Sequence, residues 1–268
     1  MSYNQSISQN LPFFINVLRN QICVHPSLDP YHPSVLKFSR KEVKHRCTRE
    51  SDWIIARKGI VQLSPGALQK YKHVKCRLVP IYRGESDNKI KFGSPINLFG
   101  NKIQTISDFF KTSCRSINGS RYMNVHSTIA YNKAIFDRLS SIKTELPRNR
   151  TLNILMLGFD SVSRNSWIRN LPASHSYFTK NLNGVVLEGY NIVGDGTPQA
   201  LLPILTGKTE EELPEARRGY NGSTTVDNHP WIWKNFSRLG YVTQWGEDMA
   251  YIGTFNVRMN GFKHAPVD

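Results

Sequence analysis

Residues 152–160 read LNILMLGFD, an almost continuous apolar run that ends in a glycine, an aromatic residue and a carboxylate. A run of this length is typical of a strand buried on both faces of a parallel sheet. GVVLEGYNIVG (184–194) is a second such run, and YVTQWGED (241–248) is a third. Between them, TPQALLPILTG (197–207) and NHPWIWKNFSRLG (228–240) have helical patterns, the latter stopped by its final glycine. Strands alternating with helices predict an α/β fold with a parallel sheet.

Polar residues follow each of the three predicted strands. They are Asp160, then Asp195 with Thr197, then Glu247 with Asp248. In an α/β fold, functional groups gather at the carboxyl ends of the strands. Carboxylates on rigid strand ends suit a divalent cation, and a metal-bound threonine oxygen at a helix start can act as a nucleophile. We therefore expect Asp160 and Thr197 to belong to one site.

Each of these residues also has a simpler local explanation. A threonine before a proline is a common helix N-cap, which suits Thr197 followed by Pro198. An aspartate at a strand end, such as Asp160, is often a turn or capping residue. Glu247 and Asp248 could simply begin a loop. The two roles of Thr197 are compatible, because a capping oxygen already faces the positive end of the helix.

The ordered combination is more specific than its parts. ILMLGFDSVSR (154–164), LEGYNIVGDGTPQALLPILTG (187–207) and GYVTQWGEDMAYIGTFNVRMNGF (240–262) follow one another along the chain. Together they resemble a sulfatase-like animal ectodomain family, of nematode type and unassigned function, within the alkaline phosphatase/sulfatase superfamily. The first half of the chain fits the upstream region of that family more loosely.

The resemblance implies the first part of an alkaline-phosphatase-like parallel-sheet domain. By position, Asp160 would be a metal ligand, Thr197 the metal-bound nucleophile, and Glu247 and Asp248 contacts to the substrate. The expected cofactor is a divalent metal (Zn, Mn or Ca). Formylglycine sulfatases carry Cys or Ser at the nucleophile, with Pro at +2 and Arg at +4. Here Thr197 is followed by Pro198 and, at +4, Leu201, so phosphate esters are favoured over sulfate esters as the substrate.

The resemblance also implies further metal ligands downstream, typically an Asp-His pair and additional histidines. The sequence ends at Asp268 without them, and His175, His229 and His264 lack a paired metal spacing. These three are more typical of surface or internally hydrogen-bonded histidines. We therefore expect a fragment or truncated product that is weakly active or inactive, and whether it is an enzyme stays open.

Charge divides the chain near residue 150. Residues 1–150 carry 25 Lys/Arg against 9 Asp/Glu, whereas residues 151–268 carry 10 against 11. This division predicts a basic region with four cysteines (1–149), whose patterns favour strands, before the α/β domain (150–268). A basic region suggests an alternative function, a non-catalytic extracellular protein that recognises acidic glycans or other partners. The sequence has no zinc-finger spacing, no RRM-like aromatic signature and no basic helix followed by heptad repeats, which argues against nucleic acid as the partner.

The cysteines and the N-terminus bear on the compartment. The four cysteines, Cys23, Cys47, Cys76 and Cys114, suit two disulfides in any of three connectivities, or four thiols. LPFFINVL (11–18) is too short for a membrane span and makes a poor signal peptide. The family resemblance nonetheless implies an extracellular or membrane-tethered ectodomain.

Local patterns predict four elements in the basic region. DWIIARKGIVQL (52–63) and HVKCRLVPIYR (73–83) have the composition of short strands. ISDFFKTSC (106–114) and STIAYNKAIFDRLSSI (127–142) are predicted to be helical, the latter with Ile129, Ile135, Phe136 and Leu139 at helical spacing.

Overall fold

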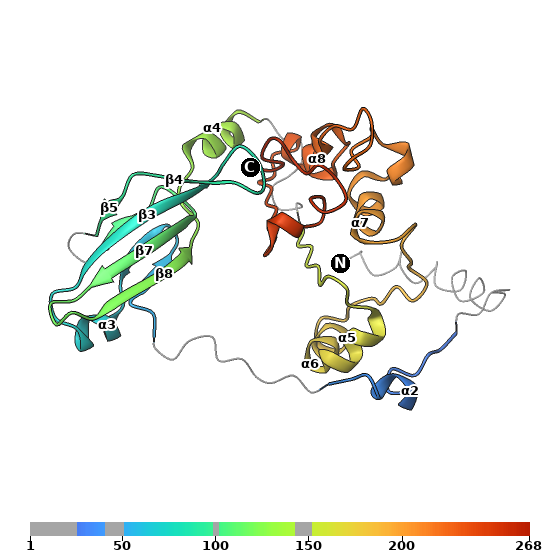
Figure 1. The fold of residues 1–268 in the computed structure, drawn as a ribbon, viewed down its shortest axis with the longest axis horizontal. Helices are drawn as coiled ribbons and strands as arrows, with labels where there is room; N and C mark the ends of the chain where they lie inside the picture. The colour runs from blue at the N-terminus through green and yellow to red at the C-terminus, as the bar shows by residue number, and fades with distance from the viewer. Residues whose placement is uncertain (1–25, 41–50, 99–101, 143–151) are drawn as a thin grey trace, which may run out of the picture. The chain divides into compact units, whose positions relative to one another are not determined.

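The computed structural model describes residues 26–40, 51–98, 102–142 and 152–268, which belong to two compact units (Figure 1). One unit spans 1–43 with 156–191, and the other spans 44–155 with 192–268. The predicted domain division at 149/150 stays a prediction, because residues 143–151 are not described. The elements of the first unit are α2 (Pro33–Leu36), α5 (Arg164–Asn170), α6 (Pro172–Ser176) and the π-helical turn η2 (Tyr177–Asn181).

The second unit contains both sheets and most of the helices. Its elements are β1 (Ile54–Arg57), β2 (Ile60–Leu63), α3 (Pro65–Lys70), β3 (Lys75–Arg83), β4 (Ile90–Phe92), β5 (Ile96–Asn97), β6 (Lys102–Gln104), β7 (Phe109–Arg115), β8 (Arg121–Ser127), α4 (Lys133–Ser141), α7 (Thr197–Thr206), α8 (Ile232–Arg238) and the 3₁₀ turns η3 (Glu210–Glu212), η4 (Val226–Asn228) and η5 (Ala250–Ile252).

Both sheets are antiparallel. Strands β1, β2 and β6 form a three-stranded sheet in that order. The five-stranded sheet has the order β4-β3-β7-β8, with β5 also paired to β3. Buried and exposed residues alternate along β7, and half-buried and exposed residues alternate along β8, as expected of a sheet with one solvated face. The buried face packs on the three-stranded sheet in a core that includes Trp53, Val61, Leu78 and Phe110.

A disulfide joins the two central strands of the larger sheet. Cys76 of β3 lies directly opposite Cys114 of β7 in the strand register, with a Cα–Cα distance of 4.1 Å. Both cysteines belong to the buried core. The prediction that the cysteines form disulfides is confirmed for this pair. Cys23 and Cys47 lie outside the described residues.

The strand and helix predictions for the basic region are correct in three of four places. Strands β1 and β2 lie within 52–63, β3 lies within 73–83, and α4 lies within 127–142. The predicted helix at 106–114 is wrong, because most of it forms β7. Its inward residues Phe110, Thr112 and Cys114 recur every second position, which is the period of a strand.

A second core forms around α7 and α8. Leu202 and Leu205 of α7 pack with a group of aromatic residues that includes Trp231, Phe255 and Phe262. The indole N–H of Trp231 donates to the carbonyl oxygen of Val226 at 2.8 Å, so its polar atom is satisfied within the core. Both helices coincide with the sequence predictions, and α7 has a proline near its start, as expected.

Two contacts tie this core to the larger sheet. Arg83, the last residue of β3, donates through Nη2 to the carbonyl oxygen of Phe262 at 2.8 Å. The backbone N–H of Phe262 donates in turn to Asp87 Oδ2 at 2.9 Å. Arg83 and Asp87 are themselves paired at 2.8 Å. The C-terminal segment is thus held by the β3–β4 hairpin.

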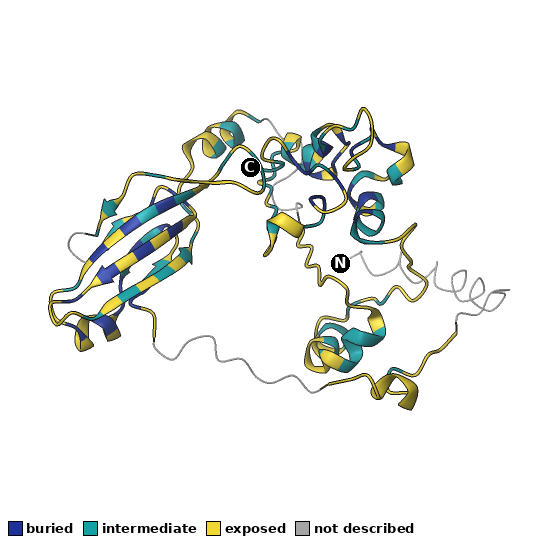
Figure 2. Cartoon of the chain, viewed as in Figure 1, coloured by how far each residue is buried: buried dark blue, intermediate teal, exposed yellow. Residues whose placement is uncertain are grey.

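The predicted parallel sheet is not formed by the described residues. The segments 152–159, 184–194 and 241–248 contain no strand, and most of their apolar residues are exposed (Figure 2). Leu155 is 87% exposed and Val185 is 78% exposed. Hydrophobic composition indicates that a segment would be stable when buried, but a strand also needs neighbours that bond its backbone. The mixed α/β character is therefore correct, whereas the parallel arrangement is corrected to two antiparallel sheets.

Candidate active site at the start of helix α7

The turn that leads into α7 depends on a glycine. Gly196 has a φ of 103° and a ψ of −175°, a conformation that side-chain-bearing residues rarely adopt. A Cβ atom at this position would also lie 2.7 Å from Nη1 of Arg258. The absence of a side chain at Gly196 therefore allows both the sharp turn and the close approach of a guanidinium group.

Arg258 is fixed to this turn by two contacts with Asp195. Its Nη1 donates to the backbone carbonyl of Asp195, and its Nη2 lies 3.3 Å from the Oδ2 of the same residue. The Asp195 side chain is 97% exposed, so the ion pair contributes little stability. A guanidinium has five N–H groups, so Arg258 can keep both contacts and still donate to an anionic ligand. Sequence reasoning missed Arg258, which is 63 residues from Asp195.

Thr197 is the first residue of α7. The helix has Gly196 at its N-cap and Pro198 near its start, so the predicted N-cap at Thr197 is displaced by one residue. Thr197 is half-buried. It lies at the positive end of the helix dipole, where backbone N–H groups favour a negative charge. Buried Pro198, Leu202 and Leu205 anchor the same helix in the core.

Asp160 lies in the other unit. It is exposed and lies in the turn before α5, where Ser161 has a φ of 57° and Ser163 caps the helix by accepting from Ser166 N at 3.2 Å. Since Asp160 and Thr197 belong to different units, their membership of one site stays a prediction.

Glu247 and Asp248 differ in their surroundings. Glu247 is half-buried, and its Oε1 accepts from the backbone N–H of Thr254 at 2.6 Å, which holds the turn around η5. A Cβ atom at Gly253 would clash with the other carboxylate oxygen of Glu247. Asp248 is exposed. Glu247 therefore has a structural contact, while Asp248 is open to solvent.

The three histidines singled out in the sequence differ in their surroundings. His229 is fully buried, its Nε2 lies 3.2 Å from the Pro214 carbonyl, and burial lowers the pKa of its imidazole. His175 is half-buried and meets Trp167 edge-on, and His264 is exposed. Across the described ranges, no group of three or more His, Cys, Asp or Glu side chains could hold a metal ion.

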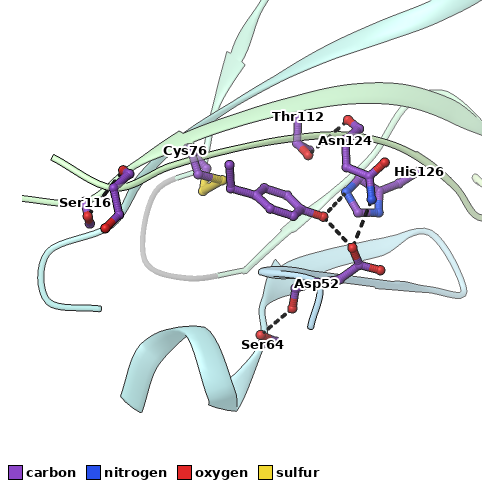
Figure 3. Close-up of a disulfide and its surroundings, with 10 residues drawn as sticks. Asp52, Ser64, Cys76, Thr112, Ser116, Asn124 and His126 are labelled. Carbon is purple, nitrogen blue, oxygen red and sulfur yellow. Dashed lines mark hydrogen bonds between the residues drawn. A yellow bond between two sulfur atoms is a disulfide. The ribbon is translucent and has the colours of Figure 1, made fainter. Parts of the chain in front are cut away.

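A polar network that sequence reasoning missed joins the two sheets near the disulfide (Figure 3). Asp52 Oδ1 accepts from Tyr122 Oη and from Asn124 Nδ2, each at 2.9 Å, and Tyr122 Oη lies 3.1 Å from His126 Nε2. Burial is the main cause that raises the pKa of Tyr122 to about 12. Burial also lowers the pKa of His126 below its usual 6.5, against the attraction of Asp52.

A comparison with protein families decides where the chain belongs. Residues 40–268 match the model of the family described as "Protein of unknown function (DUF229)". The chain is a member of the DUF229 family. This family is sulfatase-like, which confirms the resemblance read from the three sequence blocks at the family level. No curated protein and no solved structure matches the chain.

Membership of DUF229 covers both sheets and the start of α7 but assigns no role to any residue. The roles of Asp160, Thr197, Glu247 and Asp248 therefore stay predictions. In the parts of this DUF229 chain that the structure describes, no helix is long and apolar enough to cross a membrane.

Proposed function

We propose that this DUF229 domain catalyses hydrolysis or transfer at phosphate esters, weakly in the chain as given, with Thr197 as the nucleophile. Sulfate esters are the less favoured substrates, since the chain lacks the residues required for formylglycine formation. The observation that carries the proposal is the start of α7, where Thr197 follows a glycine turn bound by the Arg258 guanidinium.

Two sources of positive potential support this role. The N-terminus of α7 favours negative charge on its first residues, and the Arg258 guanidinium matches the geometry of phosphate oxygens. The helix end is in place before a substrate binds, because α7 is anchored in the core, and Arg258 lies beside the turn through its contacts with Asp195. Preorganised donors of this kind stabilise the charge that develops in a transition state.

The chemistry has two balanced steps. The Thr197 hydroxyl oxygen attacks phosphorus, loses its proton, and forms a phosphothreonine ester as the alcohol leaves with a proton. Water then attacks the same phosphorus, the Thr197 oxygen departs and regains its proton, and phosphate is released. If another alcohol attacks in place of water, the result is transfer. Arg258 would bind the non-bridging oxygens in both steps.

A divalent metal (Zn, Mn or Ca) belongs to the proposal through the sulfatase-like family. Asp160 and Thr197 are the residues of this chain that would contribute ligands. The described residues do not by themselves assemble a metal site, so we assign no step to the metal. Asp248, which is exposed, and Glu247 are proposed to contact the part of the substrate beyond the phosphate.

We also propose an extracellular or membrane-tethered location, which the Cys76–Cys114 disulfide supports.

Kinetics with bis(4-nitrophenyl) phosphate test the proposal. We expect hydrolysis in the presence of zinc, manganese or calcium, and a loss of roughly 100-fold or more in kcat on Thr197→Ala, since the nucleophile is removed. Arg258→Ala should mainly raise KM, by roughly tenfold, because it removes a contact to the phosphate.

Thr206→Ala is the matched control, because it removes a threonine from the other end of α7. Its hydroxyl donates only within the helix end, to the Leu202 and Lys208 carbonyls. Its kcat should equal that of the wild type. Equal rates for Thr197→Ala and the wild type, or no hydrolysis with any of the three metals, would contradict the proposal.

A further inference from the structure

The solvent-facing side of the five-stranded sheet is strongly basic. Residues alternate between the two faces: Cys76, Phe110, Thr112 and Cys114 are buried in the core, and their immediate neighbours along β3 and β7 are exposed. The outward positions of β3, β7 and β8 include five exposed cations, here named the basic face: Lys75, Arg77, Lys111, Arg115 and Arg121.

Three of these cations lie side by side across three strands. Lys75 is directly opposite Arg115, and Arg115 is directly opposite Arg121. Arg77 belongs to the next outward row, and Lys111 to the row after it. Strands lie about 5 Å apart and alternate residues about 7 Å apart, so the basic face covers about 10 Å by 14 Å.

Nothing in the described part of the chain neutralises this charge. None of the five cations forms an ion pair with a described acidic residue. The residues that share their rows are uncharged: Ser113, Met123, Val79 and Val125. Like charges directly opposite one another in a sheet repel and cost stability, and a bound anion would relieve that repulsion.

The surface is also hollowed at this position. A depression of about 620 Å³ lies over the end of the sheet that carries the row of three cations. Lys75, Arg77, Arg115 and Arg121 line it, and Asn97 and Ser113 add uncharged hydrogen-bonding groups. The depression therefore offers several cations together with partners for hydroxyl groups.

The disulfide bears on which class of polyanion would bind the basic face. Cys76 and Cys114 belong to the strands that carry the basic face, and disulfides persist in oxidising compartments. The polyanions of such compartments are chiefly acidic glycans, whereas anionic lipids concentrate on the cytoplasmic leaflet. The depression also has only one aromatic residue among the described residues that line it, Tyr122, whose ring stacks on Trp53 of the core, whereas single-stranded nucleic acids stack on exposed rings.

We propose that the basic face binds sulfated polysaccharides, with Lys75, Arg115 and Arg121 contacting successive sulfate groups. This binding is independent of the proposed chemistry at Thr197. It gives the chain a site for anionic polymers on its antiparallel sheet, separate from the start of α7.

A heparin decasaccharide is the probe, and calorimetry or fluorescence anisotropy is the measurement. The triple variant Lys75→Ser, Arg115→Ser, Arg121→Ser should bind roughly 100-fold more weakly at about 0.15 M salt, and the dependence of log Kd on log salt should become shallower. The control triple variant Arg57→Ser, Lys91→Ser, Lys102→Ser removes the same charge from exposed positions on β1, β4 and β6. It should bind within about threefold of the wild type.

Each other outcome overturns the proposal. Equal weakening by the two triple variants would mean that net charge alone attracts heparin. Tighter binding to a single-stranded DNA oligonucleotide or to phosphatidylserine vesicles than to heparin would assign the face to another partner, and equal affinity for desulfated heparin would exclude the sulfate contacts. Thr197→Ala should bind heparin like the wild type, so a failure here is distinguishable from a failure of the proposed hydrolase.

Discussion

Single residues decide whether the start of α7 can act as a site. Gly196 makes the turn possible, Arg258 provides a cation beside it, and Thr197 provides the oxygen. Thr197 and its glycine turn are visible in the sequence, because Gly-Asp-Gly-Thr-Pro is a helix-start pattern. Arg258 is not, since its place depends on a tertiary contact across 63 residues.

Gly196→Ala separates backbone strain from the contact with Arg258. Both Gly196 and Gly119 have positive φ, but a Cβ at Gly119 would meet open space. Each alanine variant should lose about 1–2 kcal/mol in the free energy of unfolding by urea titration. Only Gly196→Ala should also raise KM, because its methyl group displaces the guanidinium. Equal KM values for the two variants would show that Arg258 does not serve the site.

His126 predicts a pH dependence of stability. Its folded pKa is lowered by burial, so the unfolded chain binds a proton first as the pH falls below about 6.5. The contribution of the neutral imidazole is therefore complete above that pH and is lost as the pH falls through the folded pKa. Urea titrations from about pH 8 to about pH 5 should show falling stability, with a shallower fall in His126→Gln. An unchanged slope in that variant would contradict a lowered pKa for His126 in the folded chain.

At the scale of elements, the sequence predicts most of the helices and strands that depend on local sequence pattern. The elements β1, β2, β3, α7 and α8 are recognisable from composition, alternation and capping. The helix predicted at 106–114 is wrong, because the inward residues of β7 recur every second position. The apolar runs at 152–159 and 184–194 read as buried strands because composition does not determine whether a strand finds a partner.

The row of like charges makes a prediction for the larger sheet. Arg115 lies between Lys75 and Arg121, so Arg115→Ser should raise the free energy of unfolding by about 0.5 kcal/mol at low salt. Lys111→Ser is the control, because Lys111 faces Val79 and Val125 and should leave stability nearly unchanged. Thermal unfolding at two salt concentrations measures both. A loss of stability in Arg115→Ser would mean that its side chain packs on the sheet rather than repels its neighbours.

In the whole molecule, the basic residues and the proposed nucleophile lie in different parts of the sequence. The excess of basic residues falls before residue 150, and five of those cations lie on the exposed face of the larger sheet. The start of α7 lies in the nearly neutral second half. Composition predicts that division, but it cannot show that the cations share one face, since this depends on strand register. The proposed pairing of Asp160 with Thr197 likewise goes beyond local sequence, because the two residues belong to different units.

The central claim is that Thr197 forms a covalent ester with the substrate. Acid quenching of the chain during turnover of bis(4-nitrophenyl) phosphate, followed by mass spectrometry of its peptides, tests this directly. We predict one phosphoryl or aryl-phosphoryl group on Thr197 in the wild-type chain and no adduct on the corresponding peptide of Thr197→Ala. Turnover without an adduct on that peptide, an adduct on another residue, or the same adduct in both chains is the result that would contradict the account.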